Sequence, residues 1–169
     1  LNNIYSLAVT KSEHTAESIM KLSNIMRYVT DDARENIVSL SKEIDCIKDY
    51  VDLQKLRLGK NTEVILEIAG DISQKQIAPL LFMSFVENAF KYGVSNHEPS
   101  AITIRLTAGE KTILFETVNK IFESKKTMER TGIGQANALK RLDRLYQHKH
   151  SVDINTANGF YTVQLTLED

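Results

Sequence analysis

Four polar side chains stand near the end of the apolar stretch Ile77–Gly93 (IAPLLFMSFVENAFKYG), and their types make them the best candidates for chemistry. Glu87 offers a carboxylate, Asn88 an amide, Lys91 an ammonium group and Tyr92 an aromatic ring. On a helix, Asn88 and Lys91 lie side by side because they are three residues apart. Partly buried amide and ammonium groups need partners, and a polyanion with its divalent cation would supply them. A solvated last helical turn is the alternative interpretation.

A helix over Ile77–Gly93 is the element that must position these side chains. Pro79 fits its first turn, where the missing N–H would have no partner anyway. Gly93 fits just beyond its end, where a left-handed cap is common. The apolar residues recur at helical spacing and would lie against a sheet; they are Leu80, Met83, Phe85, Val86 and Phe90.

Composition excludes several classes of protein. The net charge of -1 gives no global electrostatic case for nucleic acid as a partner. The single cysteine, Cys46, excludes an internal disulfide and a multi-cysteine zinc site, and it fits a reducing compartment. The most apolar run, Ile77–Val86, is shorter than the roughly 20 residues that a spanning helix needs. The N-terminus lacks a signal-peptide pattern, so we expect any membrane anchor to lie outside this chain.

The first third of the chain predicts a helical hairpin. Apolar residues return every three or four positions from Asn2 to about Thr30, which predicts one amphipathic helix. In the second helix, Ser41 is the expected N-cap, Glu43 suits the first turn, and Gly59 ends the run. Neither helix can cover the whole apolar face of the other, so we expect a four-helix bundle with a second copy of the chain. Packing against the rest of the chain is the alternative.

After Gly59 the apolar period changes from that of a helix to that of strands. The turn Asn158-Gly159 between two alternating runs is a strong hairpin signal. Mostly antiparallel strands with two or three helices on one face predict an α+β sandwich. The expected strands are Thr62–Ile68, Ala101–Leu106, Lys111–Asn119, Val152–Asn155 and Tyr161–Leu167.

The sequence Gly132-Ile133-Gly134 opens the last expected helix, after an irregular and highly charged segment, Lys120–Arg130. Glycines let the backbone approach a phosphate closely, and the N-terminus of a helix favours an anion. Ordinary turn formation is the alternative interpretation of such a short motif.

The order VENAFKYG, a strand ending in Asn119, and GIGQANALKRL resembles the N box and glycine boxes of histidine kinase ATP-binding domains, which have the Bergerat fold of the wider GHKL group. The segments LNNIYSLA, LSNIMRY and SLSKEIDCIKDYVDLQKLRLG are similar to the dimerisation helices of LytS-type sensor histidine kinases. The resemblance covers nearly the whole chain. It implies a dimerisation hairpin in residues 1–59 and an ATP-binding catalytic domain in residues 60–169.

The resemblance also implies roles for the residues of the first motif. Asn88 matches the asparagine whose amide oxygen holds Mg²⁺ between the nucleotide phosphates. Lys91 matches a phosphate contact, and Tyr92 matches a residue near the adenine. Glu87, just before the metal ligand, would orient water or the metal, so Glu87 and Asn88 are the implied catalytic pair. The cofactors are thus ATP and Mg²⁺.

Later motifs match the family with departures. Gly132 and Gly134 match the glycines that hinge the ATP lid, and Asn137 would face the phosphates. Asn119 stands where the family has an aspartate that receives the adenine amino group, and the glycine that usually follows is absent. An asparagine oxygen can still accept that hydrogen bond. Gln135 replaces a usual leucine.

The phosphoacceptor histidine of this family lies in an HFxFN motif just before the LNN with which this chain opens. We therefore expect the acceptor outside this chain, and we expect the chain alone not to autophosphorylate. His14 lacks that motif, and His97, His148 and His150 fall in expected loops. The implied protein is the cytoplasmic part of a sensor kinase that is anchored to the membrane upstream, forms a homodimer and phosphorylates a response regulator.

Two other functions are possible for the same fold. One is a non-catalytic dimerisation and signalling module with a weakened nucleotide site, an alternative suggested by Asn119. The other is an ATPase clamp of the wider GHKL group, which is disfavoured because a helical hairpin precedes the ATP domain.

Overall fold

The computed structural model describes residues 2–95, 97–122 and 133–168, and the chain forms two compact units. The first unit comprises Leu1–Leu58 and Ser73–Leu80. The second comprises Gly59–Ile72 and Leu81–Asp169. A short segment from the middle of the chain therefore belongs with the N-terminal helices.

The first unit begins with two helices, α1 (Asn2–Val9) and α2 (Thr15–Thr30), so the expectation of one continuous helix is wrong. The Thr10 hydroxyl donates hydrogen bonds to two carbonyl oxygens of the preceding turn, at 3.0 and 3.1 Å. Lys11 then takes a positive φ of 51°, which a helix does not allow. The polar patch after α1 thus ends the helix.

The helix α3 (Leu40–Lys55) follows a short 3₁₀ turn, η1 (Asp32–Arg34), and the strand β1 (Val38–Ser39). Its N-cap is Ser39, whose hydroxyl accepts a hydrogen bond from the Lys42 amide at 3.4 Å, so the expected cap at Ser41 is wrong. β1 pairs antiparallel with β3 (Gln76–Ile77), which holds Ser39 in the extended conformation that an N-cap needs.

The helices α2 and α3 pack as an antiparallel hairpin, joined at several points along their length. Lys21 of α2 forms an ion pair with Asp52 of α3, and Asn24 donates to Asp49 at 3.0 Å. Apolar side chains remain exposed on α1 and α2, and they are Tyr5, Val9, Ile19, Met20, Met26 and Val29.

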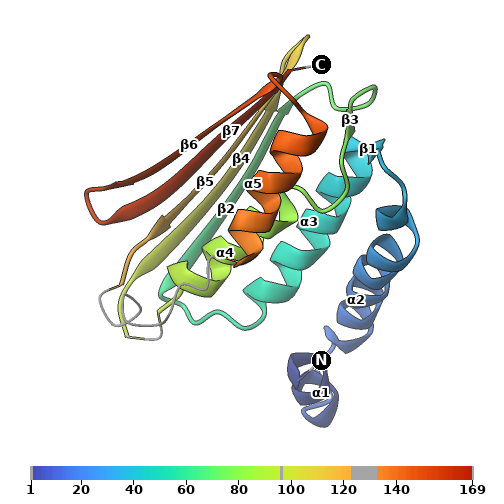
Figure 1. The fold of residues 1–169 in the computed structure, drawn as a ribbon. Coiled ribbons are helices and arrows are strands. Elements are labelled where there is room, and N and C mark those ends of the chain that lie inside the picture. The colour runs from blue at the N-terminus through green and yellow to red at the C-terminus, as the bar shows by residue number, and fades with distance from the viewer. Residues whose placement is uncertain (1, 96, 123–132, 169) are drawn as a thin grey trace. The chain divides into compact units, whose positions relative to one another are not determined.

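The second unit is a five-stranded mixed sheet with α4 (Met83–Gly93) and α5 (Ile133–Leu145) on one face (Figure 1). The strand order is β2-β4-β5-β7-β6, in which β2 and β4 are parallel and all other pairs are antiparallel. This arrangement confirms the expected α+β class. The strands are β2 (Thr62–Gly70), β4 (Ser100–Ala108), β5 (Thr112–Lys120), β6 (His150–Ala157) and β7 (Phe160–Glu168).

The core of the second unit lies between the sheet and its helices. Phe82, just before α4, stacks on Phe115 of β5 with ring centroids 4.2 Å apart, and Phe85 meets the same ring at 6.3 Å. Burial alternates along β4 and β5, so one face of each strand is apolar. The expected turn between β6 and β7 is confirmed, because Asn158 and Gly159 both have positive φ.

The helix α4 starts at Met83, six residues later than the sequence predicts. Ile77 lies in β3, Pro79 is outside the helix, and Leu80 has a positive φ of 58°. Tertiary pairing with β1 thus overrides the local helical preference of this segment. Gly93 is the last helical residue, and it is absent from the described glycines with positive φ, so the expected left-handed cap is wrong.

Candidate functional site

The polar end of α4 lies directly against the end of β5. A Cβ atom built on Gly93 would come within 2.5 Å of the Asn119 Cβ and 3.2 Å of its Nδ2. Real Cβ atoms do not approach so closely, so this position requires glycine. The contact joins two of the predicted site motifs, which are far apart in the sequence.

Asn119 is held in one orientation. Its side chain is 3% exposed, and its Nδ2 donates a hydrogen bond to the Lys120 carbonyl oxygen at 3.0 Å. No residue in the described part of the chain donates to its Oδ1, which leaves this oxygen as a hydrogen-bond acceptor. An ionised aspartate could not make the bond to Lys120, because a carboxylate has no proton to donate.

The other predicted residues of α4 fall on its last turns. Asn88 and Tyr92 are half-buried, whereas Glu87 and Lys91 are exposed. Although Glu87 is open to solvent, neighbouring protein removes part of its hydration and raises the pKa of its carboxyl group. The Lys91 ammonium lies 5.1 Å from the centroid of the Tyr92 ring, within range of a cation–π interaction. An amide, a cation and a ring are thus clustered at one end of the helix.

Lys120, the residue after Asn119, has two partners that the sequence analysis did not single out. Lys120 forms an ion pair with Glu98 at 3.2 Å, and its ammonium lies 5.1 Å from the centroid of the Phe122 ring. Phe122 is 2% exposed. The loop after α4 is therefore tied to the end of β5. Nothing in the sequence points to the pair of Lys120 with Glu98, because these residues are 22 positions apart.

The helix that follows the glycine motif packs against α4. Gly134 is its second residue, and Asn137 lies exposed on its first turns. Gly132 lies outside the described residues. The structure thus brings together α4, the end of β5 and α5, and it gives no geometry for the predicted role of Gly132.

The chemistry of the donor set limits how a metal ion could bind. Within residues 2–95, 97–122 and 133–168, no three His, Cys, Asp or Glu side chains form a group that could hold a metal ion. A dedicated protein cage is thus not available there. Magnesium usually takes one or two protein oxygens together with substrate phosphates, and the Asn88 amide offers one oxygen of that kind.

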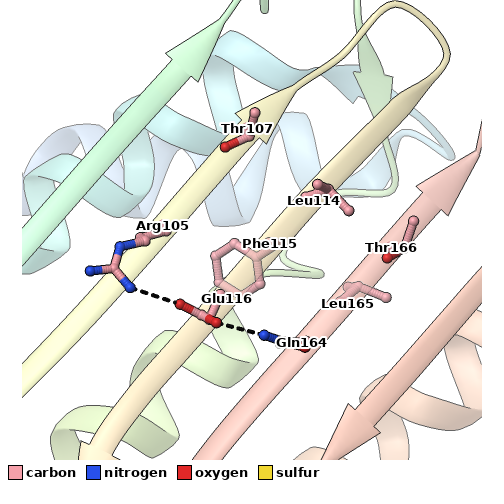
Figure 2. A pocket seen from close by; sticks show the side chains of 8 residues that line it. All are labelled: Arg105, Thr107, Leu114, Phe115, Glu116, Gln164, Leu165 and Thr166. Carbon is pink, nitrogen blue, oxygen red and sulfur yellow. Dashed lines mark hydrogen bonds and ion pairs between the residues drawn. The ribbon is translucent and has the colours of Figure 1, made fainter.

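A separate hollow of about 290 Å³ lies over β4, β5 and β7, away from the predicted site residues (Figure 2). A polar row crosses it, in which Arg105 binds Glu67 at 2.7 Å and Glu116 at 3.0 Å. Gln164 donates to Glu116 at 2.7 Å. Because two carboxylates already compensate Arg105, this hollow offers no unpaired charge for an anion.

Comparison with known proteins points to one family. The histidine kinase family model matches residues 1–62. The sensor protein LytS of Staphylococcus saprophyticus is 25% identical over 180 residues, an alignment that covers 99% of this chain and 30% of that protein. The LytS protein of Bacillus subtilis is 29% identical over 54% of this chain and 16% of its own length. The chain therefore spans less than a third of these relatives.

Solved structures share the fold at low sequence identity. The catalytic domain of histidine kinase ThkA has a TM-score of 0.55 and 13% identity, covering 78% of this chain and 93% of its own. Full-length ShkA in complex with AMPPNP has a TM-score of 0.55 and 12% identity, covering 91% and 35%. ThkA in complex with the response regulator TrrA has a TM-score of 0.52 and 14% identity, covering 91% and 49%.

The described helices are each too short or too polar to cross a lipid bilayer. The resemblance of the sequence motifs to LytS-type kinases is confirmed by relatives that align along the chain and by a fold that matches solved catalytic domains. This chain is thus similar in sequence to the LytS sensor proteins, and it shares the fold of a solved histidine kinase catalytic domain.

Proposed function

We propose that this chain binds Mg-ATP and serves as the kinase portion of a two-component sensor histidine kinase. The γ-phosphoryl group would pass to a histidine and then to a response regulator. The observation that carries this proposal is the contact between Gly93 and Asn119, which sets a side chain with an acceptor oxygen beside the polar end of α4. A purine base needs such an acceptor for its exocyclic amino group.

The nucleotide would lie with its base toward Asn119 and its phosphates toward α4 and α5. Asn119 Oδ1 would accept from the adenine amino group, while its Nδ2 donates to the Lys120 carbonyl oxygen. The Tyr92 ring would lie near the base. Lys91 and Asn137 would contact the phosphates, and charge neutralisation of this kind is the main protein contribution to phosphoryl transfer.

Asn88 would hold magnesium through its amide oxygen, and Glu87 would orient a metal-bound water. Magnesium bound there would supply positive charge that neutralises the phosphates. The residues of the chain would then bind and align the nucleotide, so that the acceptor imidazole meets the γ-phosphoryl group in line. None of the four histidines of this chain lies in an HFxFN motif.

A second copy of the chain and a response regulator are the proposed partners. The exposed apolar side chains of α1 and α2 support dimerisation, since Ile19, Met26 and Val29 recur near heptad spacing on a face that α3 does not cover. ThkA has been solved with the response regulator TrrA, and a partner of that type fits the proposed reaction. Because ATP is the substrate, we place this chain on the cytoplasmic side of the membrane.

A non-catalytic signalling module remains the second candidate, because Asn119 replaces the family's aspartate. The two candidates differ in nucleotide affinity. Titration calorimetry with Mg-ATP on the chain, on Asn88→Ala and on the exposed control Asn155→Ala separates them. We expect saturable binding by the chain and the control, and at least about tenfold weaker binding by Asn88→Ala, equal to about 1.4 kcal/mol. Absence of binding at millimolar ATP, with the fold intact, would overturn the kinase proposal in favour of the module.

A further inference from the structure

A fully buried carboxylate in the first unit joins three separate parts of the chain. Glu43 of α3 is 0% exposed. Its Oε2 accepts a hydrogen bond from the hydroxyl of Tyr28 on α2, and the same oxygen accepts from the Leu80 backbone N–H at 2.8 Å. Tyr28 is itself 4% exposed. A buried charge requires such donors, so the carboxylate ties α2, α3 and the segment before α4 into one cluster.

Leu80 is in a conformation that its sequence does not favour. Its φ of 58° is left-handed, a region that non-glycine residues avoid. Such a residue persists when its surroundings over-determine it. Here the segment is fixed to the start of α3 by the β1–β3 pairing, by the hydrogen bond from the Leu40 amide to the Lys75 carbonyl at 2.8 Å, and by the bond to Glu43.

The residues after Leu80 are also fixed. Leu81 and Phe82 are 1% and 0% exposed, and Phe82 stacks on Phe115 of β5. The Phe82 carbonyl accepts hydrogen bonds from the amides of Phe85 and Val86 at 3.0 and 3.1 Å, which form the first turn of α4. The chain on both sides of Leu80 is therefore held by packing and by hydrogen bonds.

We propose that Glu43 is a positioning residue that couples α2 to the left-handed backbone of Leu80. The same oxygen of Glu43 accepts both hydrogen bonds. If the Tyr28 hydroxyl moves away, the carboxylate is less firmly positioned and its hydrogen bond with the Leu80 amide weakens. A displacement of α2 along or around α3 would thereby release the backbone of Leu80 from its left-handed conformation. This coupling goes beyond the proposed nucleotide site and does not depend on nucleotide binding.

Amide hydrogen exchange, measured by NMR on the whole chain, tests the coupling. The exchange rate of the Leu80 amide reports its hydrogen bond to Glu43, and that of the buried Val51 amide of α3 reports global unfolding. In Tyr28→Phe we expect Leu80 to exchange about tenfold faster, the equivalent of one lost hydrogen bond, with a smaller change at Val51. Glu43→Leu should accelerate Leu80 further. The control Glu63→Gln changes an exposed carboxyl on β2 and should leave both amides unaltered.

The double variant distinguishes coupling from a general loss of stability. If Tyr28 acts through Glu43, then Tyr28→Phe has no added effect on Leu80 exchange in the Glu43→Leu background. Unchanged Leu80 exchange in Tyr28→Phe, an undiminished effect in the Glu43→Leu background, or equal acceleration of Val51 would each overturn the proposal.

Glu43→Gln keeps the test decisive if Glu43→Leu does not fold, since it retains the shape of the side chain. The glutamine oxygen is a neutral and therefore weaker acceptor. We expect the Leu80 amide proton to move upfield and to exchange faster than in the parent chain. A Leu80 resonance and exchange rate identical to those of the parent chain would contradict a bond to the Glu43 carboxylate.

Discussion

Gly93, the last residue of α4, lies against the side chain of Asn119 so closely that no Cβ atom fits between them. The end of α4 is therefore held at a fixed distance from β5. The contact that positions this helix, which carries Asn88, is made with the buried side chain of Asn119. Two motifs that resemble parts of a nucleotide site are in this way held in a single geometry by the absence of one methyl group.

Gly93→Ala should lower the free energy of unfolding by about 1–3 kcal/mol, because the added methyl overlaps Asn119. Helix propensity alone would favour alanine by about 1 kcal/mol. A decrease in the free energy of unfolding would therefore have to come from the contact with Asn119. Urea denaturation measures it. The matched control is Gly59→Ala, whose Cβ would meet no atom within 4 Å and should be neutral or stabilising. A Gly93→Ala chain as stable as the parent would show that the end of α4 can move.

Asn119→Asp should lower stability at neutral pH by about 1–3 kcal/mol, since it loses the bond to the Lys120 carbonyl and buries a charge. Burial would raise the folded-state pKa of the new carboxyl group. The folded state would then hold more protons than the unfolded state between the two pKa values, so stability falls as pH rises through that window. Denaturation at several pH values checks this slope against the parent chain. If Asn119→Asp and the parent chain were equally stable at pH 7, the hydrogen bond to the Lys120 carbonyl would contribute nothing to stability.

Tyr28 should make the protein lose stability in alkali. Burial first, and then the Glu43 carboxylate, raise the pKa of Tyr28 above its ordinary value of 10.0. Stability from this group is complete below pH 10 and is lost as pH rises above it, because only the unfolded state then releases the proton. Tyr28→Phe should show a shallower decline in urea denaturation between about pH 9 and 11. The exposed control Tyr5→Phe should decline as the parent does, and a parent-like slope in Tyr28→Phe would contradict the prediction.

Met26→Glu should break the proposed dimer without unfolding the chain. Met26 is 56% exposed, so the change should alter unfolding by less than about 0.5 kcal/mol. A charge in an apolar interface should weaken self-association by at least about tenfold. Sedimentation equilibrium measures this, with Lys111→Glu in the β4–β5 turn as the control. Unaltered self-association in Met26→Glu would place the contact between copies elsewhere.

Local patterns in the sequence predicted much of the second unit. Alternation along β5 and β7 identified half-buried strands, and Asn158-Gly159 identified the turn before β7, since both signals depend only on neighbouring residues. The same patterns put Asn88, Lys91 and Tyr92 on the last turns of one helix. Motif order also predicted the resemblance to LytS-type kinases, which the comparisons confirm.

Features that arise from long-range contacts were not predictable in this way. Pro79 suits the first turn of a helix, but β3 pairs with β1, and this pairing delays α4 until Met83. Gly93 was interpreted as a local cap, whereas its requirement comes from Asn119 on a different element. Glu43 suited the dipole of its own helix, and nothing near it in the sequence points to Tyr28 or Leu80.

The assignment of Ser73–Leu80 to the first unit limits how this polypeptide can be divided. A piece that begins at Gly59 would carry β3 without β1, and so would lose the pairs Val38–Ile77 and Ser39–Gln76. Ile77 and Ala78, which are 0% and 1% exposed, would then meet water as an open strand edge. Such edges recruit other chains. Cutting the chain before Gly59 is therefore expected to yield a self-associating product, and a shorter piece needs β1 on the same polypeptide to cover that edge.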